Sequence, residues 1–173
     1  MRITSCGLTD VGRKREHNED SFARCDEMGL YLVADGMGGH AAGEVASRMA
    51  MSVIVDFVGR TLKDGEKDWP LRVETGCGPV QDMLVTAVHL ANLTICELSE
   101  GNTRYSGMGT TIAGVFIRDA VMHVVHVGDS RVYLMREGQF EALTSDHSWV
   151  NEQIQLNVLT EEEARNHRWR NVI

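Results

Sequence analysis

Residues 30–40 read LYLVADGMGGH, a short apolar run that stops at an aspartate and a glycine-rich turn. The apolar run predicts a buried strand over 30–34. The glycines that follow allow a sharp turn and expose carbonyl oxygens. Asp35 and the Gly36 carbonyl would then offer oxygen ligands of the kind that Mg²⁺ and Mn²⁺ prefer. The alternative is a plain strand-to-helix turn in which Asp35 caps the next helix.

Two long helical patterns follow this turn, over about 41–62 and 80–99, each with an apolar stripe at helical spacing. Strand-like segments lie on either side of them, at 3–8 and 21–24 before the helices, and at 111–117, 121–127, 132–135 and 140–143 after them. The segment from 146 onward is helical in character, with a capping pattern at 160–163. This order predicts an α+β fold in which antiparallel sheet packs against helices.

The bulk composition narrows the class of protein. With 173 residues and 43% hydrophobic content, we expect a single domain over 1–173. The net charge of -8, from 25 acidic and 17 basic residues, argues against nucleic acid as the main partner. The four widely spaced cysteines indicate reduced thiols in the cytoplasm. No apolar run is long enough for a signal peptide or a membrane span.

Two further acidic clusters lie at predicted strand edges. Residues 15–20 read REHNED, and residues 127–131 read VGDSR. Each has an ordinary explanation, since Glu19 and Asp20 would be solvated in a polar loop and Asp129 would sit in a hairpin turn. A sheet can, however, bring the ends of separate strands together. The three acidic sites, including Asp35, therefore predict a site for more than one metal ion.

Five motifs in order resemble a known family. They are REHNEDS at 15–21, DGMGGH at 35–40, GTT at 109–111, VGDSR at 127–131 and LTSDHS at 143–148. These motifs resemble those of the metal-dependent type-2C serine/threonine protein phosphatases, in their bacterial form. The resemblance implies an α+β fold, an antiparallel β-sandwich flanked by α-helices, with two divalent metals, Mn²⁺ or Mg²⁺, at one edge between the sheets.

The resemblance also implies a metal-binding role for several residues. Asp35 would bridge both metals, and Gly36 would bind one of them through its carbonyl oxygen. Glu19 and Asp20 would hold the second metal directly or through water. Asp129 matches a position that helps to bind a third, weaker metal in relatives.

The implied reaction is attack of a metal-activated water on the phosphorus of phosphoserine or phosphothreonine. Arg15 would grip the phosphate, because a guanidinium can form bidentate hydrogen bonds to its oxygens. The general acid is open, since Met37 stands where many eukaryotic relatives have a histidine. His40 is the nearest candidate, and it could equally orient the loop or face solvent. The implied partners are phosphorylated proteins and a cognate serine/threonine kinase with its substrates.

The pattern departs from the family after Asp146. The family has two later metal-binding aspartates, one before glycine and one before asparagine, and neither pair occurs here. We therefore expect a C-terminally shortened domain, with an apolar sheet edge exposed and open to self-association. We also expect weak metal binding and little activity unless another copy covers the sheet. The alternative function is an inactive or regulatory module that binds a phosphoprotein or another partner.

Overall fold

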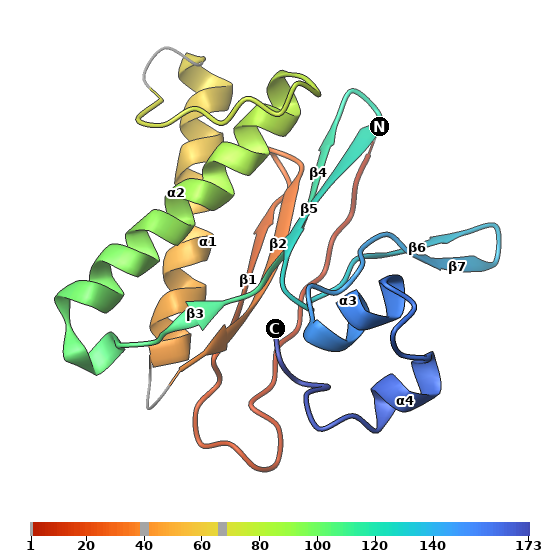
Figure 1. Cartoon of the computed structure of the whole chain (residues 1–173). Helices are drawn as coiled ribbons and strands as arrows, with labels where there is room; N and C mark the ends of the chain where they lie inside the picture. The colour runs from red at the N-terminus through yellow and green to blue at the C-terminus, as the bar shows by residue number, and fades with distance from the viewer. Residues whose placement is uncertain (1, 39–41, 66–68) are drawn as a thin grey trace.

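The computed structural model describes residues 2–38, 42–65 and 69–173. Its main feature is an antiparallel sheet in the order β1-β2-β4-β5, drawn in Figure 1. These strands are β1 (Asp20–Cys25), β2 (Leu30–Met37), β4 (Ile112–Arg118) and β5 (Val121–Val127). The short strand β3 (Gly109–Thr110) pairs with the end of β2. The α+β fold with antiparallel sheet is therefore confirmed.

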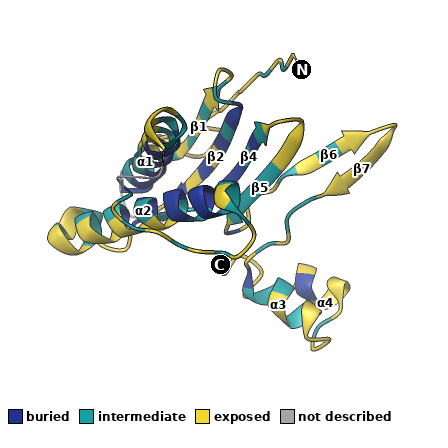
Figure 2. Cartoon of the chain, turned by 90° about the horizontal axis from the view of Figure 1, so that it is seen from above, coloured by how far each residue is buried: buried dark blue, intermediate teal, exposed yellow. Residues whose placement is uncertain are grey.

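Two long helices, α1 (Ala42–Asp64) and α2 (Pro79–Gly101), lie on one face of this sheet. Residues at steps of four form the buried side of α1, namely Ala46, Ala50, Ile54 and Val58. They pack with the inward residues of β2, which alternate along the strand as Leu30, Leu32 and Ala34. Figure 2 shows the buried residues gathered where helices and sheet meet. The two predicted helices are confirmed to within two residues at each end.

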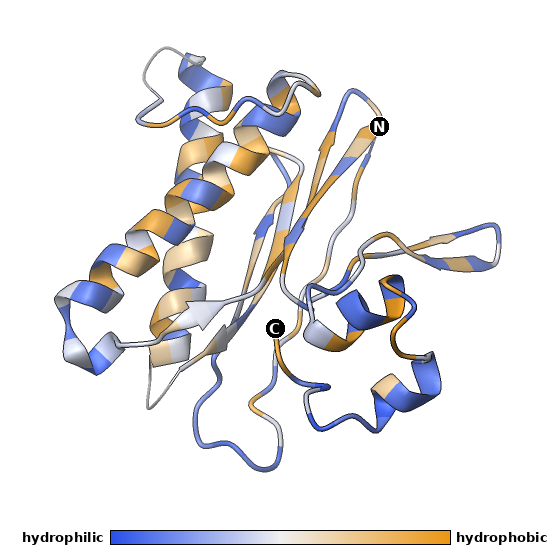
Figure 3. Cartoon of the chain, viewed as in Figure 1, coloured by the Kyte–Doolittle hydropathy of each residue, from blue (hydrophilic) through white to orange (hydrophobic). Residues whose placement is uncertain are grey.

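The other sheet face carries apolar side chains that remain partly exposed. Phe22 and Val33, which are register partners, are 40% and 47% exposed. At the edge of the sheet, β5 pairs with β4 alone among the described strands, and Val121 and Val127 are exposed. Figure 3 shows apolar residues along β4 and β5 and in stripes on α2. The expected apolar exposure at the sheet edge is therefore present at β5.

A separate hairpin follows, formed by β6 (Tyr133–Arg136) and β7 (Gln139–Ala142). Its Tyr133 and Phe140 rings stack with their centroids 4.7 Å apart. The chain continues through α3 (Trp149–Gln155) and α4 (Glu161–Arg165). The predicted cap is confirmed, because Thr160 and Glu163 form a reciprocal capping box at the start of α4. A one-turn 3₁₀ helix, Thr103–Tyr105, follows α2.

The predicted strand over 3–8 is wrong, since residues 2–8 form no strand. The segment instead lies against the face of the sheet. A Cβ added to Gly7 would fall 2.5 Å from the Phe22 ring, so the backbone passes directly over that side chain. A chain on the face of a sheet cannot reach the unpaired backbone groups at its edge. Among the helices described, none has the length and apolar character needed to cross a membrane.

The first turn of α2 is tied to the preceding loop by Asp82, which is 8% exposed. One carboxylate oxygen of Asp82 accepts hydrogen bonds from the backbone N–H and the hydroxyl of Thr75, both at 2.7 Å. The Thr75 hydroxyl and then its N–H lower the pKa of Asp82. The charged carboxylate is therefore the form that the fold stabilises.

We expect Asp82→Asn to lower the Tm by several degrees at pH 7. A lowered pKa contributes stability above the ordinary value of 3.8, and this contribution is lost as pH falls through the lowered pKa. Thermal unfolding at pH 7 and at pH 3 measures the effect, and the difference between variant and wild type should shrink at the lower pH. Glu100→Gln, at the exposed end of α2, is the control. An equal Tm difference at both pH values would contradict this role.

Candidate functional site

Asp20 and Asp35 are direct partners across β1 and β2. Their neighbours Ser21 and Ala34 turn toward the helices, so both carboxylates lie on the face that the helices leave open. Burial raises the pKa of Asp35, and the nearby Asp20 carboxylate raises it further. Arg15 acts in the opposite direction, whereas Asp129 adds to the increase. The predicted carboxylates Asp20 and Asp129 and the predicted Arg15 therefore lie close enough to Asp35 to affect its pKa.

The backbone of Asp35 is fixed from the other side by the start of β4. Its N–H donates to the Thr111 hydroxyl at 3.0 Å, and its carbonyl accepts from the Thr111 N–H at 2.9 Å. The Thr110 hydroxyl also donates to the Asp35 carbonyl at 3.0 Å. Asp20, Asp35 and Ser130 line one cavity of about 340 Å³. This cavity therefore lies beside the Asp20 and Asp35 pair.

Glu19 does not share the face of Asp20 and Asp35. Its side chain is 14% exposed and accepts from the Arg15 guanidinium at 2.9 Å. The other oxygen, Oε1, is buried and has no hydrogen-bond partner in the described part of the chain. A Cβ added to Gly43 would fall 2.6 Å from this oxygen, so the carboxylate lies against the first turn of α1. Adjacent residues of an extended chain point to opposite faces, which separates Glu19 from Asp20.

Gly36 occupies a position that has no room for a side chain. A Cβ there would fall 2.1 Å from the Gly43 carbonyl oxygen and 2.6 Å from the Glu19 carbonyl oxygen. The Gly36 N–H donates to that same Glu19 oxygen at 3.2 Å. The glycine is therefore required for close approach of three backbone segments.

The oxygen atoms at the site suit a hard divalent cation, but only a few side chains supply them. Asp20 and Asp35 supply carboxylate oxygens whose mutual repulsion a cation would relieve, and Glu19 supplies a buried oxygen without a partner. Over residues 2–38, 42–65 and 69–173, no three His, Cys, Asp or Glu side chains are grouped to hold a metal. The predicted general acid, His40, lies outside the described residues.

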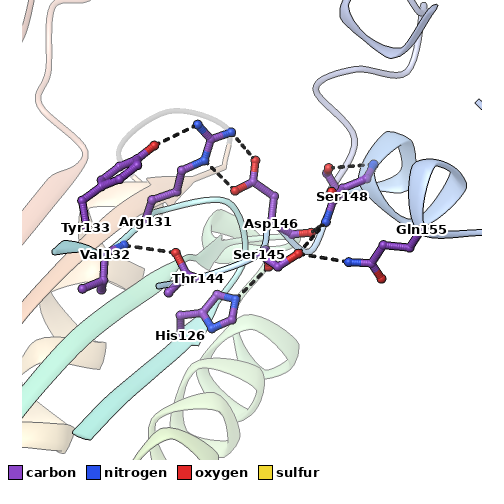
Figure 4. A network of polar contacts seen from close by, with 10 residues as sticks. His126, Arg131, Val132, Tyr133, Thr144, Ser145, Asp146, Ser148 and Gln155 are labelled. Carbon is purple, nitrogen blue, oxygen red and sulfur yellow. Dashed lines mark hydrogen bonds and ion pairs between the residues drawn. The ribbon is translucent and has the colours of Figure 1, made fainter. Parts of the chain in front are cut away.

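Sequence reasoning missed a polar network beside the site, shown in Figure 4. Arg131 forms a bidentate ion pair with Asp146, with N to O distances of 2.6 and 2.5 Å, and donates to the Tyr133 hydroxyl at 3.2 Å. His126 Nε2 lies 2.9 Å from the Ser145 carbonyl oxygen. The network joins the turn after β5 to the segment before α3. The VGDSR and LTSDHS motifs pointed to both segments, but not to their contact.

Comparisons with known proteins find matches over almost the whole chain. The model of the family described as protein phosphatase 2C matches residues 11–172. The serine/threonine phosphatase stp of Listeria monocytogenes is 35% identical over 168 residues, and the protein phosphatase PhpP of Streptococcus pneumoniae is 37% identical over 169. The alignments cover 95% and 96% of this chain, but only 63% and 64% of those proteins. The chain thus spans less than two thirds of their length.

Solved structures also match most of this chain but a smaller share of their own length. The serine/threonine phosphatase of S. agalactiae superposes with a TM-score of 0.79 and 37% identity, covering 96% of this chain and 65% of that one. The catalytic domain of the phosphatase PstP, solved in complex with two manganese ions, gives a TM-score of 0.71 and 33% identity. That match covers 88% of this chain and 60% of that one.

We expect Gly36→Ala to lower the free energy of unfolding by about 3 kcal/mol, at the upper end of overpacking effects. The added methyl group must displace the backbone of Gly43 or Glu19, which cannot move as a flexible side chain would. Urea unfolding measures the change. Gly101→Ala is the control, because a Cβ there meets open space. Equal stabilities for the two variants would show that the backbones at Gly36 are not closely packed.

Proposed function

The chain belongs to the protein phosphatase 2C family, whose model matches residues 11–172, and on this premise we propose that it hydrolyses phosphoserine and phosphothreonine in proteins. The observation that carries this proposal is the Asp20 and Asp35 pair, held opposite each other on the open face, with Arg15 close enough to lower the pKa of Asp35. The paired carboxylates can hold a metal cation, and the arginine can bind an anionic substrate. Together they suit metal-assisted hydrolysis of a phosphate ester.

The proposed cofactor is a pair of Mn²⁺ or Mg²⁺ ions, in line with the two manganese ions in PstP. Asp20, Asp35 and the Gly36 carbonyl would hold these ions, with Glu19 in support, and Asp129 would contribute to a third, weaker site. When bound, such ions lower the pKa of water and offset the charge of a phosphoryl group. The carboxylates would orient the ions. Burial raises the pKa of Asp35 most and the Asp20 carboxylate raises it further, and a bound cation would offset this repulsion.

Arg15 is the proposed phosphate-binding residue. Its side chain is 64% exposed, and one terminal nitrogen pairs with Glu19. A guanidinium has five N–H donors, so this bond leaves donors for bidentate contact with a phosphate. Glu19 thereby orients Arg15 while its other oxygen stays buried. The proposed general acid is His40, next to the Asp35 turn in sequence.

A second candidate function is a regulatory module that binds phosphoproteins or a partner without turnover. The observation that favours it is the lack of any three grouped metal-binding side chains in the described ranges. The proposed partners in either case are phosphorylated proteins and a cognate serine/threonine kinase, and the exposed β5 edge supports self-association. We place the protein in the cytoplasm, which agrees with its four free cysteines.

We expect the chain to release phosphate from a phosphothreonine peptide slowly and only with Mn²⁺. Asp35→Asn should reduce this rate at least about 100-fold, because it removes a charged ligand on which the cation depends. Millimolar Mn²⁺ should also raise the Tm of the wild type but not that of the variant. Asp119→Asn, in the exposed turn between β4 and β5, is the control. Peptide binding without Mn²⁺-dependent release would support the regulatory module instead.

We expect Arg15→Lys to raise the KM for the phosphopeptide about tenfold while kcat changes little. A lysine retains the charge next to Glu19 but cannot make the bidentate contact. Steady-state kinetics measures the two constants. Arg118→Lys, an exposed arginine at the end of β4, is the matched control. An unchanged KM in Arg15→Lys would rule out phosphate binding by Arg15.

A further inference from the structure

Thr111 is a buried residue that touches two of the segments in the candidate site. It stands between β3 and β4 and is 2% exposed. Its hydroxyl accepts the Asp35 N–H at 3.0 Å and lies 2.6 Å from the Ser130 hydroxyl. The two segments come from strands that are not neighbours, since β4 separates β2 from β5. One hydroxyl therefore connects Asp35 to the turn that carries Asp129.

The methyl group of Thr111 also takes part in this contact. Gly128, one residue before Asp129, has φ 98°, and a Cβ there would fall 2.7 Å from Thr111 Cγ2. The methyl group is thus closely packed on the Gly128 backbone. Both branches of one β-branched side chain are used, and its few rotamers make such a contact rigid.

Ser130 extends the connection to the cavity. Its hydroxyl meets Thr111, and the residue lines the same 340 Å³ cavity as Asp20 and Asp35. The Thr111 hydroxyl accepts from Asp35, and so it can donate its own proton to Ser130. The Ser130 proton is then available to a group in the cavity.

We propose that Thr111 is a positioning residue that sets the spacing between Asp35 and the turn containing Asp129 and Ser130. The inference rests on the proposed function for its link to metal binding. Its structural part stands on the hydrogen bonds and packing alone. A Thr111 that merely fills space would stabilise the fold without coupling these two segments.

The test compares Thr111→Val, which keeps the shape but removes the hydroxyl, with Thr111→Ser, which keeps the hydroxyl. Thr86→Val is the matched control, because Thr86 is also fully buried and its hydroxyl accepts one backbone N–H, from Val73 at 2.9 Å. Thr86 lies on α2, which carries none of the predicted site residues. Both valine variants thus lose a hydrogen bond from a backbone N–H, and Thr111→Val also loses the contact with the Ser130 hydroxyl.

The first measurement is amide hydrogen exchange in the metal-free chain. We expect Thr111→Val to speed exchange about tenfold both at the Asp35 amide and within 128–131. Thr111→Ser should restore the Asp35 amide, and Thr86→Val should leave both segments unchanged. Faster exchange at Asp35 alone would overturn the proposal, because the two segments would then be independent. Equal effects of Thr111→Val and Thr86→Val at both segments would overturn it as well.

The second measurement is the Mn²⁺ concentration that gives half of the maximal rise in Tm. We expect Thr111→Val to raise this concentration about tenfold, with a smaller rise in Thr111→Ser, which lacks the methyl group, and no change in Thr86→Val. An unchanged midpoint in Thr111→Val would limit Thr111 to a structural role and overturn its link to the metal. If the wild type itself shows no Mn²⁺ response, the proposed function fails, while hydrogen exchange still decides whether Thr111 couples the segments.

Discussion

The close approach of Gly36 and Gly43 is the constraint on which the rest of the structure depends. The backbones of β2 and α1 come so near here that neither residue has room for a Cβ. This contact joins the end of the central strand to the first turn of the helix that covers it. It also places the Glu19 carboxylate beside Gly43 and leaves one of its oxygens buried without a partner among the described residues. The contact between Gly36 and Gly43 therefore holds the fold together and also positions Glu19 in the candidate site.

The two faces of the sheet differ in what they contact and in the residues that they carry. The helices bury one face and supply most of the apolar packing that stabilises the domain. The open face carries Asp20 and Asp35. Burial, and then repulsion from Asp20, work against the charged state of Asp35. Such an arrangement costs stability in the absence of a cation, and functional sites are where proteins tolerate that cost. Membership of the protein phosphatase 2C family gives the arrangement its most direct explanation.

Hydrogen bonds at the ends of strands complete the site. Thr111 connects Asp35 with Ser130, and the Arg131 pair with Asp146 connects the same turn with the segment before α3. These links run between elements that are distant in sequence. They explain why acidic residues in separate motifs lie near one another although each motif alone has an ordinary interpretation as a loop or turn.

The sequence by itself determined the α+β class, the two long helices, the capping box at Thr160 and the family, because periodicity, caps and motif order are local properties of the chain. It also placed acidic residues at the ends of strands. Only the tertiary structure decided which of them share a face: Asp20 and Asp35 do, while Glu19 lies on the helix side. It likewise decided that residues 2–8 cross the sheet face without forming a strand. The reason is that the strands that pair and the face that the helices cover depend on contacts between distant segments, which the pattern of one segment does not show.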